Sequence, residues 1–363
     1  MTQTTNPARK VIVEDDVSGF HAAFPLLLQS AEAQVLGFSA ISGNVWRDQS
    51  LAYVRRMLEI TGHPEIPALP GSVFPLLNSE AATERWEALY GKLVWKGAWS
   101  RGWVEETLQS DPRYHAHDVV VDLPIGNPTV VPASEEHAAL TMLRLTREHP
   151  GEVSIIATGP LTTLALAQSL DPGFASRVKE LVYMGGSLNP HRRRDSTSAH
   201  QFAREFANSP RREFNIRWDP EAASIVMRSP WPRVTMIPVD PSTATELTAE
   251  LLARMTAAGT PLCRALASRH PGFPLWDEIA TATWLRPDLI TESDELFIDV
   301  NTEFGPGYGD ILSWAPGYEP GLGETRQTVV RAIDVPAFED FLVELLSAPQ
   351  PPAVGLPVPA AGG

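Results

Sequence analysis

Three consecutive carboxylates, Glu14, Asp15 and Asp16, follow the apolar run Val11–Val13 near the start of the chain. Carboxylates crowded together repel one another unless a cation or a proton neutralises them. The stretch could therefore hold a metal ion, or contain a general base whose pKa its neighbours shift. The same residues are also compatible with a solvated loop whose acids favour the N-terminus of the following helix. Charge alone leaves both interpretations open.

Two further stretches carry side chains that suit polar chemistry. Asp277 lies in the run Pro274–Leu285, where it opens an apolar helix and could act as its N-cap. Glu213 and Asn215 are two residues apart, and on an extended segment they would point the same way. That arrangement suits the recognition of vicinal hydroxyls. The Asp-Pro pair at 219–220 is typical of a helix N-cap followed by the first helical residue.

These residues lie where short apolar runs give way to helical patterns. A fourth stretch, Ala157–Ala167, has a glycine turn that leaves backbone amides and carbonyls free at the end of such a run. The expected strands are Val11–Val13, Val35–Ile41, Val153–Ala157, Leu181–Met184 and Val234–Val239. The expected helices cover approximately residues 19–31, 46–60, 161–170 and 220–227. Apolar strands separated by helices predict an α/β fold, with an open, mostly parallel central sheet and helices on both faces.

Loops at the carboxyl ends of the strands are where ligands bind in such sheets. This rule selects the loops 14–19, 42–48 and 158–163, together with the segment from Gly185 onward. The acidic stretch lies in the first of these loops. We therefore expect the candidate site at this edge of the sheet.

The composition limits the classes of function. Among 363 residues, 44 acids against 29 bases give a net charge of -15, which disfavours binding to nucleic acid or to an anionic membrane. Cys263 is the only cysteine, so the chain cannot form an intramolecular disulfide or a thiolate zinc cluster. The first ten residues lack the apolar stretch of a secretory signal, and no window is apolar enough to span a membrane. We therefore expect a soluble, cytoplasmic protein.

We expect one domain over residues 1–348. The segment 74–129 is rich in Trp, Gly and Pro, and is expected to leave the sheet as an excursion. Residues 349–363 are dominated by Pro, Gly and Ala, which predicts a disordered tail. The stretch Gly305–Trp314 lacks the G-x-G-x-x-G spacing of a dinucleotide loop. We interpret it as a rigid turn near the pocket, with Tyr308 or Trp314 available for stacking.

In their order along the chain, these stretches resemble the inosine-uridine type nucleoside hydrolase family. The most specific pieces are Ala157–Ala167, the M-G-G at 184–186, and E-F-N-I-R-W-D-P-E-A-A at 213–223. The stretch Gly37–Gln49 is similar to the family's second loop and places Asn44 at its sugar-binding asparagine. The similarity extends from about residue 11 to residue 346.

This resemblance implies the nucleoside hydrolase fold and a reaction. The reaction is cleavage of the N-glycosidic bond of a ribonucleoside, or of a related small N-riboside, by water activated with a bound calcium ion. Hard Ca²⁺ prefers carboxylate and carbonyl oxygens, and a cation makes water easier for a neighbouring carboxylate to deprotonate. The resemblance also implies a homodimer or a homotetramer.

Carried over position by position, the resemblance assigns roles to individual residues. Asp16 is implied to be both metal ligand and general base, and the further ligands are the Thr158 carbonyl and Asp277. The residues implied to contact the substrate are Glu14, Asn44, Met184, Asn208, Glu213, Asn215 and Trp276. Of these, Asn208 is one residue out of register with the family.

The chain departs from the family pattern at both ends of the site. Phe20 and His21 stand where the family has two adjacent aspartates, one for the metal and one for the ribose. Neutral imidazole is a poor ligand for calcium, although it suits Zn, Fe or Ni. Trp276 stands where many members have a histidine as leaving-group acid. Tryptophan can stack on the base, but it cannot donate a proton with useful acidity.

Two other polar stretches lie outside the family motifs. His115 and His117 lie in the excursion, where they could fold over the pocket or form a solvated or packed pair. The basic run His191–Arg194 could bind a phosphate or form an exposed insertion.

Three functions are compatible with these observations. The leading hypothesis is an N-glycoside hydrolase of this family. The first alternative is a repurposed or metal-independent enzyme of the same fold that acts on another sugar-like or natural-product substrate. It is indicated by Phe20, His21 and Trp276. The second is a non-catalytic nucleoside-binding protein. In each case the expected partner is a small nucleoside-like molecule, with no nucleic acid and no membrane.

Overall fold

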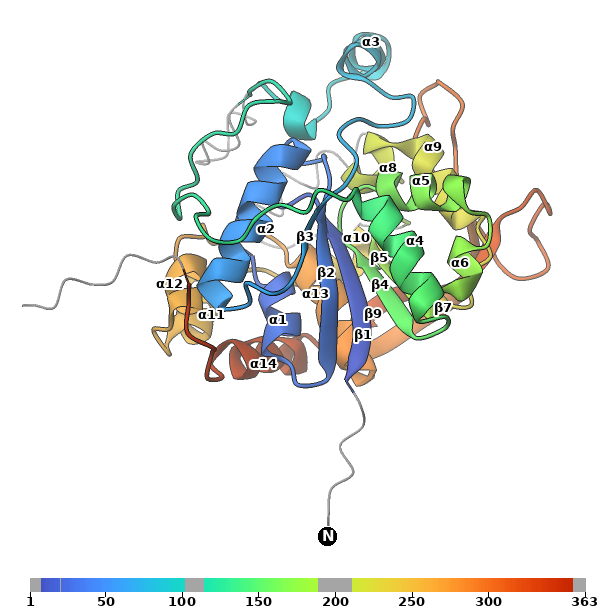
Figure 1. Ribbon diagram of the computed structural model, residues 1–363. Helices are drawn as coiled ribbons and strands as arrows, with labels where there is room; N and C mark the ends of the chain where they lie inside the picture. The colour runs from blue at the N-terminus through green and yellow to red at the C-terminus, as the bar shows by residue number, and fades with distance from the viewer. Residues whose placement is uncertain (1–7, 20, 102–113, 189–210, 355–363) are drawn as a thin grey trace, which may run out of the picture.

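The computed structural model describes residues 8–19, 21–101, 114–188 and 211–354. One nine-stranded sheet runs through it in the order β3-β2-β1-β4-β5-β6-β9-β7-β8 (Figure 1). The strands are β1 (Arg9–Asp15), β2 (Ala33–Ala40), β3 (Ala68–Pro70), β4 (Val153–Ala157), β5 (Glu180–Met184), β6 (Val234–Ile237), β7 (Ile290–Val300), β8 (Ile311–Trp314) and β9 (Thr325–Ile333). Every pairing from β3 to β9 is parallel, and only the β7 pairings with β8 and β9 are antiparallel. The predicted open, mostly parallel α/β sheet is confirmed.

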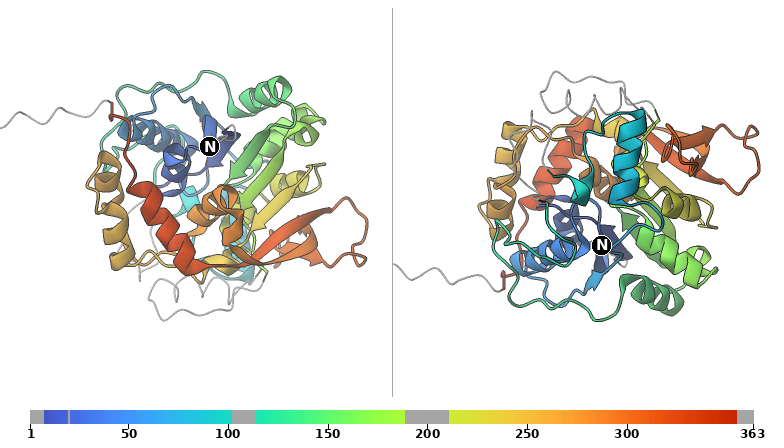
Figure 2. Two further views of the ribbon diagram at one scale, coloured as in Figure 1. Left: turned by 90° about the horizontal axis from the view of Figure 1, so that it is seen from below. Right: turned by 90° about the horizontal axis from the view of Figure 1, so that it is seen from above.

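Helices cover both faces of this sheet, as predicted (Figure 2). The first face is covered by α1 (Ala23–Gln29), α2 (Arg47–Thr61), α11 (Ala249–Thr256), α12 (Pro261–Leu266), α13 (Trp276–Leu285) and α14 (Val335–Leu346). The second is covered by α4 (Ala138–Glu148), α5 (Thr162–Leu170), α6 (Phe174–Arg177) and α9 (Pro220–Met227). The remaining elements are α3 (Glu80–Tyr90), α8 (Phe214–Trp218), α10 (Val239–Ser242) and the 3₁₀ turns Gly97–Trp99 and Pro287–Leu289. Among the described residues, no helix is long and apolar enough to cross a bilayer.

Side chains of β1 alternate between the two faces, as the two-residue period of a strand requires. Val11 and Val13 are buried in the apolar cluster under α1 and α13, whereas Ile12 is buried in the cluster under α4 and α5. Continued by two residues, this alternation places Asp15 on the α1 and α13 face. Glu14 falls on the opposite face. The neighbouring acids Glu14 and Asp15 therefore point to opposite faces of the sheet.

Several element boundaries match the sequence prediction, and some do not. The predicted ranges of β4 and α9 are the observed ones, and Asp219 caps α9 by accepting from Ala222 N at 3.1 Å. The helix expected over 19–31 was predicted too long, because α1 covers only Ala23–Gln29. The alternative of an N-cap role for Asp277 was wrong. Leu275 is the N-cap residue of α13, and Asp277 lies inside the first turn.

The segment between β3 and α4 contains the predicted excursion, and its last part contacts helix α2. Glu59 on α2 is fully buried, and its Oε1 accepts the backbone N–H groups of residues 129–131 at 2.5–3.0 Å. Its Oε2 accepts from Arg56 Nη1 at 2.8 Å. The carbonyl of Glu59 accepts from Val354 N at 2.8 Å, so residues 349–354 of the predicted tail lie against α2. Residues 355–363 lie outside the described residues.

Replacing Glu59 with alanine is expected to lower the free energy of unfolding by about 3 kcal/mol or more, because the buried Arg56 charge and three amides lose their partner. Urea denaturation followed by circular dichroism measures this loss. Glu65→Ala serves as the control, since the Glu65 side chain is 68% exposed and pairs with His63. Equal stability of the two variants would contradict this account of the excursion.

Candidate active site

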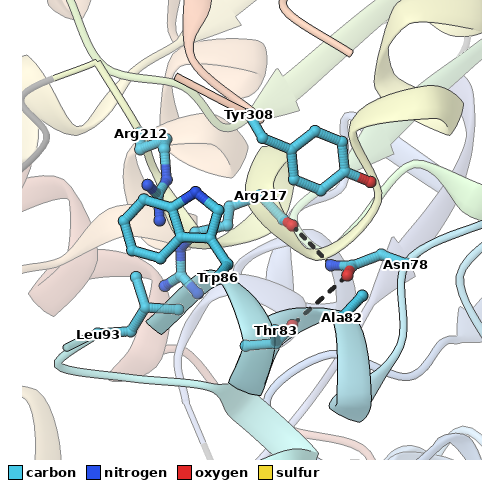
Figure 3. Close-up of a pocket in the computed structure, with 8 residues that line it drawn as sticks. All are labelled: Asn78, Ala82, Thr83, Trp86, Leu93, Arg212, Arg217 and Tyr308. Atoms are coloured by element: carbon cyan, nitrogen blue, oxygen red, sulfur yellow. Dashed lines mark hydrogen bonds between the residues drawn. The ribbon is translucent and has the colours of Figure 1, made fainter. Parts of the chain in front are cut away.

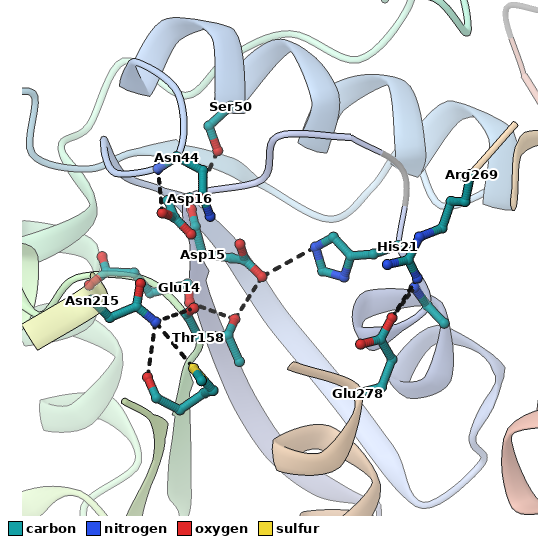
Figure 4. A network of polar contacts seen from close by, with 12 residues as sticks. Glu14, Asp15, Asp16, His21, Asn44, Ser50, Thr158, Asn215, Arg269 and Glu278 are labelled. Carbon is teal, nitrogen blue, oxygen red and sulfur yellow. Dashed lines mark hydrogen bonds and ion pairs between the residues drawn. The ribbon is translucent and has the colours of Figure 1, made fainter. Parts of the chain in front are cut away.

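Six segments converge at the carboxyl end of β1 (Figure 4). They are the loops that follow β1, β2, β4 and β5, the N-terminus of α8, and the first turn of α13. Parallel strands bring their carboxyl ends to one edge of a sheet, so residues distant in sequence meet there.

The acidic stretch at the end of β1 is buried. Glu14, Asp15 and Asp16 are each at most 1% exposed, which excludes the solvated-loop interpretation. Ser39 Oγ donates to Glu14 Oε2 at 2.8 Å, and burial raises the pKa of Glu14 to about 8. Asn44 N donates to Asp16 Oδ2 at 2.6 Å. Burial and the charge of Asp15 raise the pKa of Asp16 well above its ordinary value. Such a cluster favours a proton or a cation.

Asp15 points away from Asp16 and toward α1 and α13. Its Oδ2 lies 3.4 Å from His21 Nε2 and accepts from Thr158 Oγ1 at 2.6 Å (Figure 4). Asp15, His21 and Asp277 each offer one atom to a group in which all three atoms lie within 4.8 Å of one another. Burial and the charge of Asp15 raise the pKa of Asp277 well above its ordinary value. The three side chains form a group that is able to hold a metal ion.

The first turn of α13 also fixes the segment that carries His21. Glu278 Oε1 accepts from Ala22 N at 3.2 Å and from Arg269 Nη1 at 2.8 Å. Glu278 is 2% exposed, so this contact ties the loop after β1 to α13 within the protein interior. The imidazole of His21 packs against Phe24, with ring centroids 5.1 Å apart. Backbone anchoring on one side and ring packing on the other hold His21 beside Asp15.

The residues assigned to the sugar gather around the ends of β4 and β5. Asn215 Nδ2 donates to the Thr158 carbonyl at 3.0 Å and to the Met184 carbonyl at 3.1 Å (Figure 4). Glu213 accepts from Gly186 N at 2.9 Å and from two amides of α8. The prediction that Glu213 and Asn215 share an extended segment was wrong, because Glu213 is the N-cap of α8 and Asn215 lies within that helix. The helix still brings both side chains to this edge of the sheet.

A chain of polar contacts connects Asn44 to Arg217, one of the residues that line a small pocket drawn in Figure 3. Asn44 Oδ1 accepts from Trp95 Nε1 at 2.7 Å, and the Trp95 carbonyl accepts from Arg217 Nη2 at 2.8 Å. In this pocket the guanidinium of Arg212 lies 3.7 Å from the ring centroid of Trp86, and Tyr308 lines the same pocket. The side chains that line the pocket therefore support the loop that carries Asn44.

Comparison of the sequence and the fold with those of known proteins identifies the family. Residues 11–340 match the family model described as inosine-uridine preferring nucleoside hydrolase. The chain belongs to this family. It is 29% identical to uridine nucleosidase 1 of Arabidopsis thaliana, over 94% of each chain. It is 28% identical to probable uridine nucleosidase 1 of Oryza sativa subsp. japonica, over 94% of this chain and 97% of the relative. A solved plant nucleoside hydrolase shares the fold, with a TM-score of 0.68 at 22% identity, covering 94% of this chain and all of the other.

Of the remaining residues singled out in the sequence of this nucleoside hydrolase family member, some lie near the site or pack elsewhere, and others fall outside the described residues. Trp276 is the first residue of α13 and packs at the border of the apolar cluster, 6.4 Å from Phe273 between ring centroids. His117 is exposed and lies edge-on against the half-exposed Phe74, with ring centroids 4.9 Å apart, which favours the solvated or packed pair. Phe20, Asn208 and the basic run His191–Arg194 lie outside the described residues.

Sequence reasoning assigned no role to Asp15, although the structure places it in the group that could hold a metal. The alternation of side chains along β1 between the two faces of the sheet indicates the position of Asp15. Val11 and Val13 lie on the α1 and α13 face, and Asp15 continues that series. His21 lies just before α1, and Asp277 lies in the first turn of α13. Asp15, His21 and Asp277 therefore belong to the same face of the sheet.

The carboxyl of Glu213 gives a prediction about pH. Burial raises its pKa from 4.5 to about 7, so between these values the folded protein binds a proton that the unfolded chain has released. The free energy of unfolding should therefore fall as pH rises from about 4.5 to 7, by at most about 3 kcal/mol from this group. Denaturant titrations of the wild type and of Glu213→Gln across pH 5–8 measure the difference. Parallel curves for the two proteins would contradict the raised pKa.

Proposed function

We propose that this protein hydrolyses the N-glycosidic bond of a ribonucleoside, with Asp16 as the general base that accepts a proton from water. Membership of the nucleoside hydrolase family supports the reaction class. The observation that carries the assignment is a buried carboxylate, Asp16, at the carboxyl end of β1. It lies beside Asn44, and Asn215 is placed at the same edge through its bonds to Thr158.

Asp16 is suited to a base that acts away from bulk solvent. Its Oδ2 is fixed by the Asn44 amide, which holds the carboxylate in one orientation. Attack of water at C1′ passes through an oxocarbenium-like transition state, so a neighbouring negative charge also stabilises the sugar. Burial and the charge of Asp15 raise the pKa of Asp16 and so favour its protonated form, and a nearby positive charge would favour the ionised form that a base requires.

The ribose would be held by side chains whose orientations are already fixed. Asn44 and Asn215 each have one end of the amide engaged by the protein, with Trp95 and with the Thr158 carbonyl respectively. Glu213 is held by three backbone amides. Fixed rotamers reduce the conformational cost of binding. We assign these three side chains, together with Glu14 and Met184, to the sugar, and Trp276 to the base.

The family resemblance implies calcium, and the residues present do not match an all-oxygen calcium cage. When bound, a divalent cation supplies a positive charge that acidifies water and neutralises the acidic cluster. Calcium takes six to eight oxygen ligands, whereas the group at this site contains the imidazole of His21. The Thr158 carbonyl, an expected ligand, accepts from Asn215. The calcium ion, the homodimer or homotetramer, and the cytoplasmic location stay predictions.

The test is an assay for free base and free ribose with a nucleoside panel, run with divalent cations supplied. Uridine leads the panel because two plant relatives are named uridine nucleosidases, followed by cytidine, inosine, guanosine and adenosine. Turnover of at least one nucleoside is expected. Saturable binding without turnover of any of them, by a folded protein, would contradict hydrolysis and favour the non-catalytic alternative.

A further inference from the structure

The face of the sheet beneath α1 and α13 carries a set of potential metal ligands that the proposed base and sugar contacts do not use. Asp15, His21 and Asp277 place three ligand atoms within 4.8 Å of one another. Among the described residues, neither ring nitrogen of His21 makes a hydrogen bond, although both are shielded from solvent. A buried polar atom without such a partner is costly unless another ligand satisfies it. The one polar contact that the structure gives the imidazole is the 3.4 Å approach of Nε2 to Asp15 Oδ2, itself a member of the group, so the two ring nitrogens point to a ligand absent from the protein itself.

We propose that Asp15, His21 and Asp277 bind a first-row divalent transition-metal ion, of which Zn²⁺ is the model, in preference to Ca²⁺. Imidazole nitrogen is a good ligand for such ions and a poor one for calcium. One imidazole and two carboxylates also match the three protein ligands that catalytic zinc sites provide, with a further position open. This inference names the cation of the proposed hydrolytic site, and its catalytic meaning rests on that proposed function.

Neighbouring residues hold these ligands in place. Thr158 Oγ1 donates to Asp15 Oδ2 at 2.6 Å and so orients the carboxylate (Figure 4). Glu278, which follows Asp277 in α13, accepts from Ala22 N and so anchors the residue after His21. Outer hydrogen bonds of this kind fix the orientation of ligands around metal ions in proteins.

The arrangement separates two roles that the family resemblance combines in Asp16. The Asp16 carboxylate is engaged by Asn44 N and is not a member of the three-residue group. Asp15 is its neighbour in sequence, but its carboxylate points away from Asp16 and toward His21 (Figure 4). The ion would therefore lie beside the base instead of being held by it, and substitution of Asp16 should leave most of the metal affinity intact.

The test is calorimetric titration of the purified, metal-stripped protein with Zn²⁺ and with Ca²⁺, with bound metal counted by elemental analysis. The wild type is expected to bind about one Zn²⁺ per chain and to keep it in millimolar Ca²⁺. His21→Ala is expected to weaken Zn²⁺ binding at least about 100-fold. His21→Asp, which substitutes an oxygen ligand, should shift the preference toward Ca²⁺. His63→Ala is the matched control, because His63 pairs with exposed Glu65 in another part of the chain.

Calcium binding as tight as zinc binding in the wild type would overturn the inference. Zinc binding that survives in both His21 variants would also overturn it, and circular dichroism shows whether each variant is folded. Because binding is measured without substrate, the two claims fail separately. Zinc binding without nucleoside turnover would leave the metal inference standing and refute the function. Turnover with calcium alone would support the proposed function and refute the inference that the site prefers zinc.

Discussion

Replacement of Asp16 by asparagine is expected to lower kcat for nucleoside hydrolysis by about 10²–10⁴-fold, the range in which a positioned general base contributes. The amide keeps the size of the side chain and can still accept from Asn44 N, but it cannot accept a proton from water. Stability should not fall, because burial and the charge of Asp15 already raise the pKa of Asp16 and disfavour its ionised form, which the neutral amide cannot adopt. Steady-state kinetics and a denaturant titration of the same preparation measure both effects.

Asp288→Asn provides the control for that experiment. Asp288 is exposed and pairs with Arg286 outside the site, so the same chemical change there should leave kcat unchanged. If Asp16→Asn keeps a kcat within a few-fold of the wild type, Asp16 is not the base. Zinc affinity of the variant separates a lost base from a lost cation, since Asp16 lies outside the proposed ligand group.

Replacement of Gly43 by alanine is expected to reduce kcat by about 100-fold or more without unfolding the protein. A Cβ built at Gly43 would lie 2.0 Å from Asp16 Oδ2 and 2.7 Å from its Cγ, so the carboxylate must move. A displacement of about 1 Å of a catalytic group is enough for a loss of that size. The backbone of Gly43 does not have a positive φ, so alanine adds little strain beyond this contact.

Gly19→Ala is the matched control for Gly43→Ala. Gly19 lies in the loop that contains Asp16, yet a Cβ there meets no atom within 4 Å. Kinetics at saturating substrate should show a large loss for Gly43→Ala and none for Gly19→Ala. Equal activity of the two variants would show that the position of the Asp16 carboxylate does not limit the reaction.

Much of the fold could be predicted because the signals are local. Wholly apolar runs such as Val153–Ala157 define buried parallel strands, and the Asp-Pro pair at 219–220 marks the start of α9. The convergence of the strand ends at one edge then follows from parallel topology. Local patterns of this kind do not depend on the rest of the chain.

The arrangement of the site was harder to predict, because it depends on tertiary contacts. Glu213 and Asn215 lie around the start of a short helix whose amides bind the Glu213 carboxylate, and no alternation of residues indicates this. The family motif assigns roles to Glu14 and Asp16 and none to Asp15, so the resemblance does not indicate that Asp15 belongs to the site. The pairing of Asp15 with His21 depends on how α1 packs against α13, which only the assembled sheet determines.

The residues at the carboxyl end of β1 are proposed to catalyse hydrolysis of an N-riboside. The most direct measurement is the parallel quantification of free base and free ribose from the best nucleoside of the panel, in phosphate-free buffer, for the wild type and Asp16→Asn. The account predicts equimolar base and ribose from the wild type and almost none from the variant. Absence of ribose from every nucleoside, or equal release by the two proteins, would contradict it.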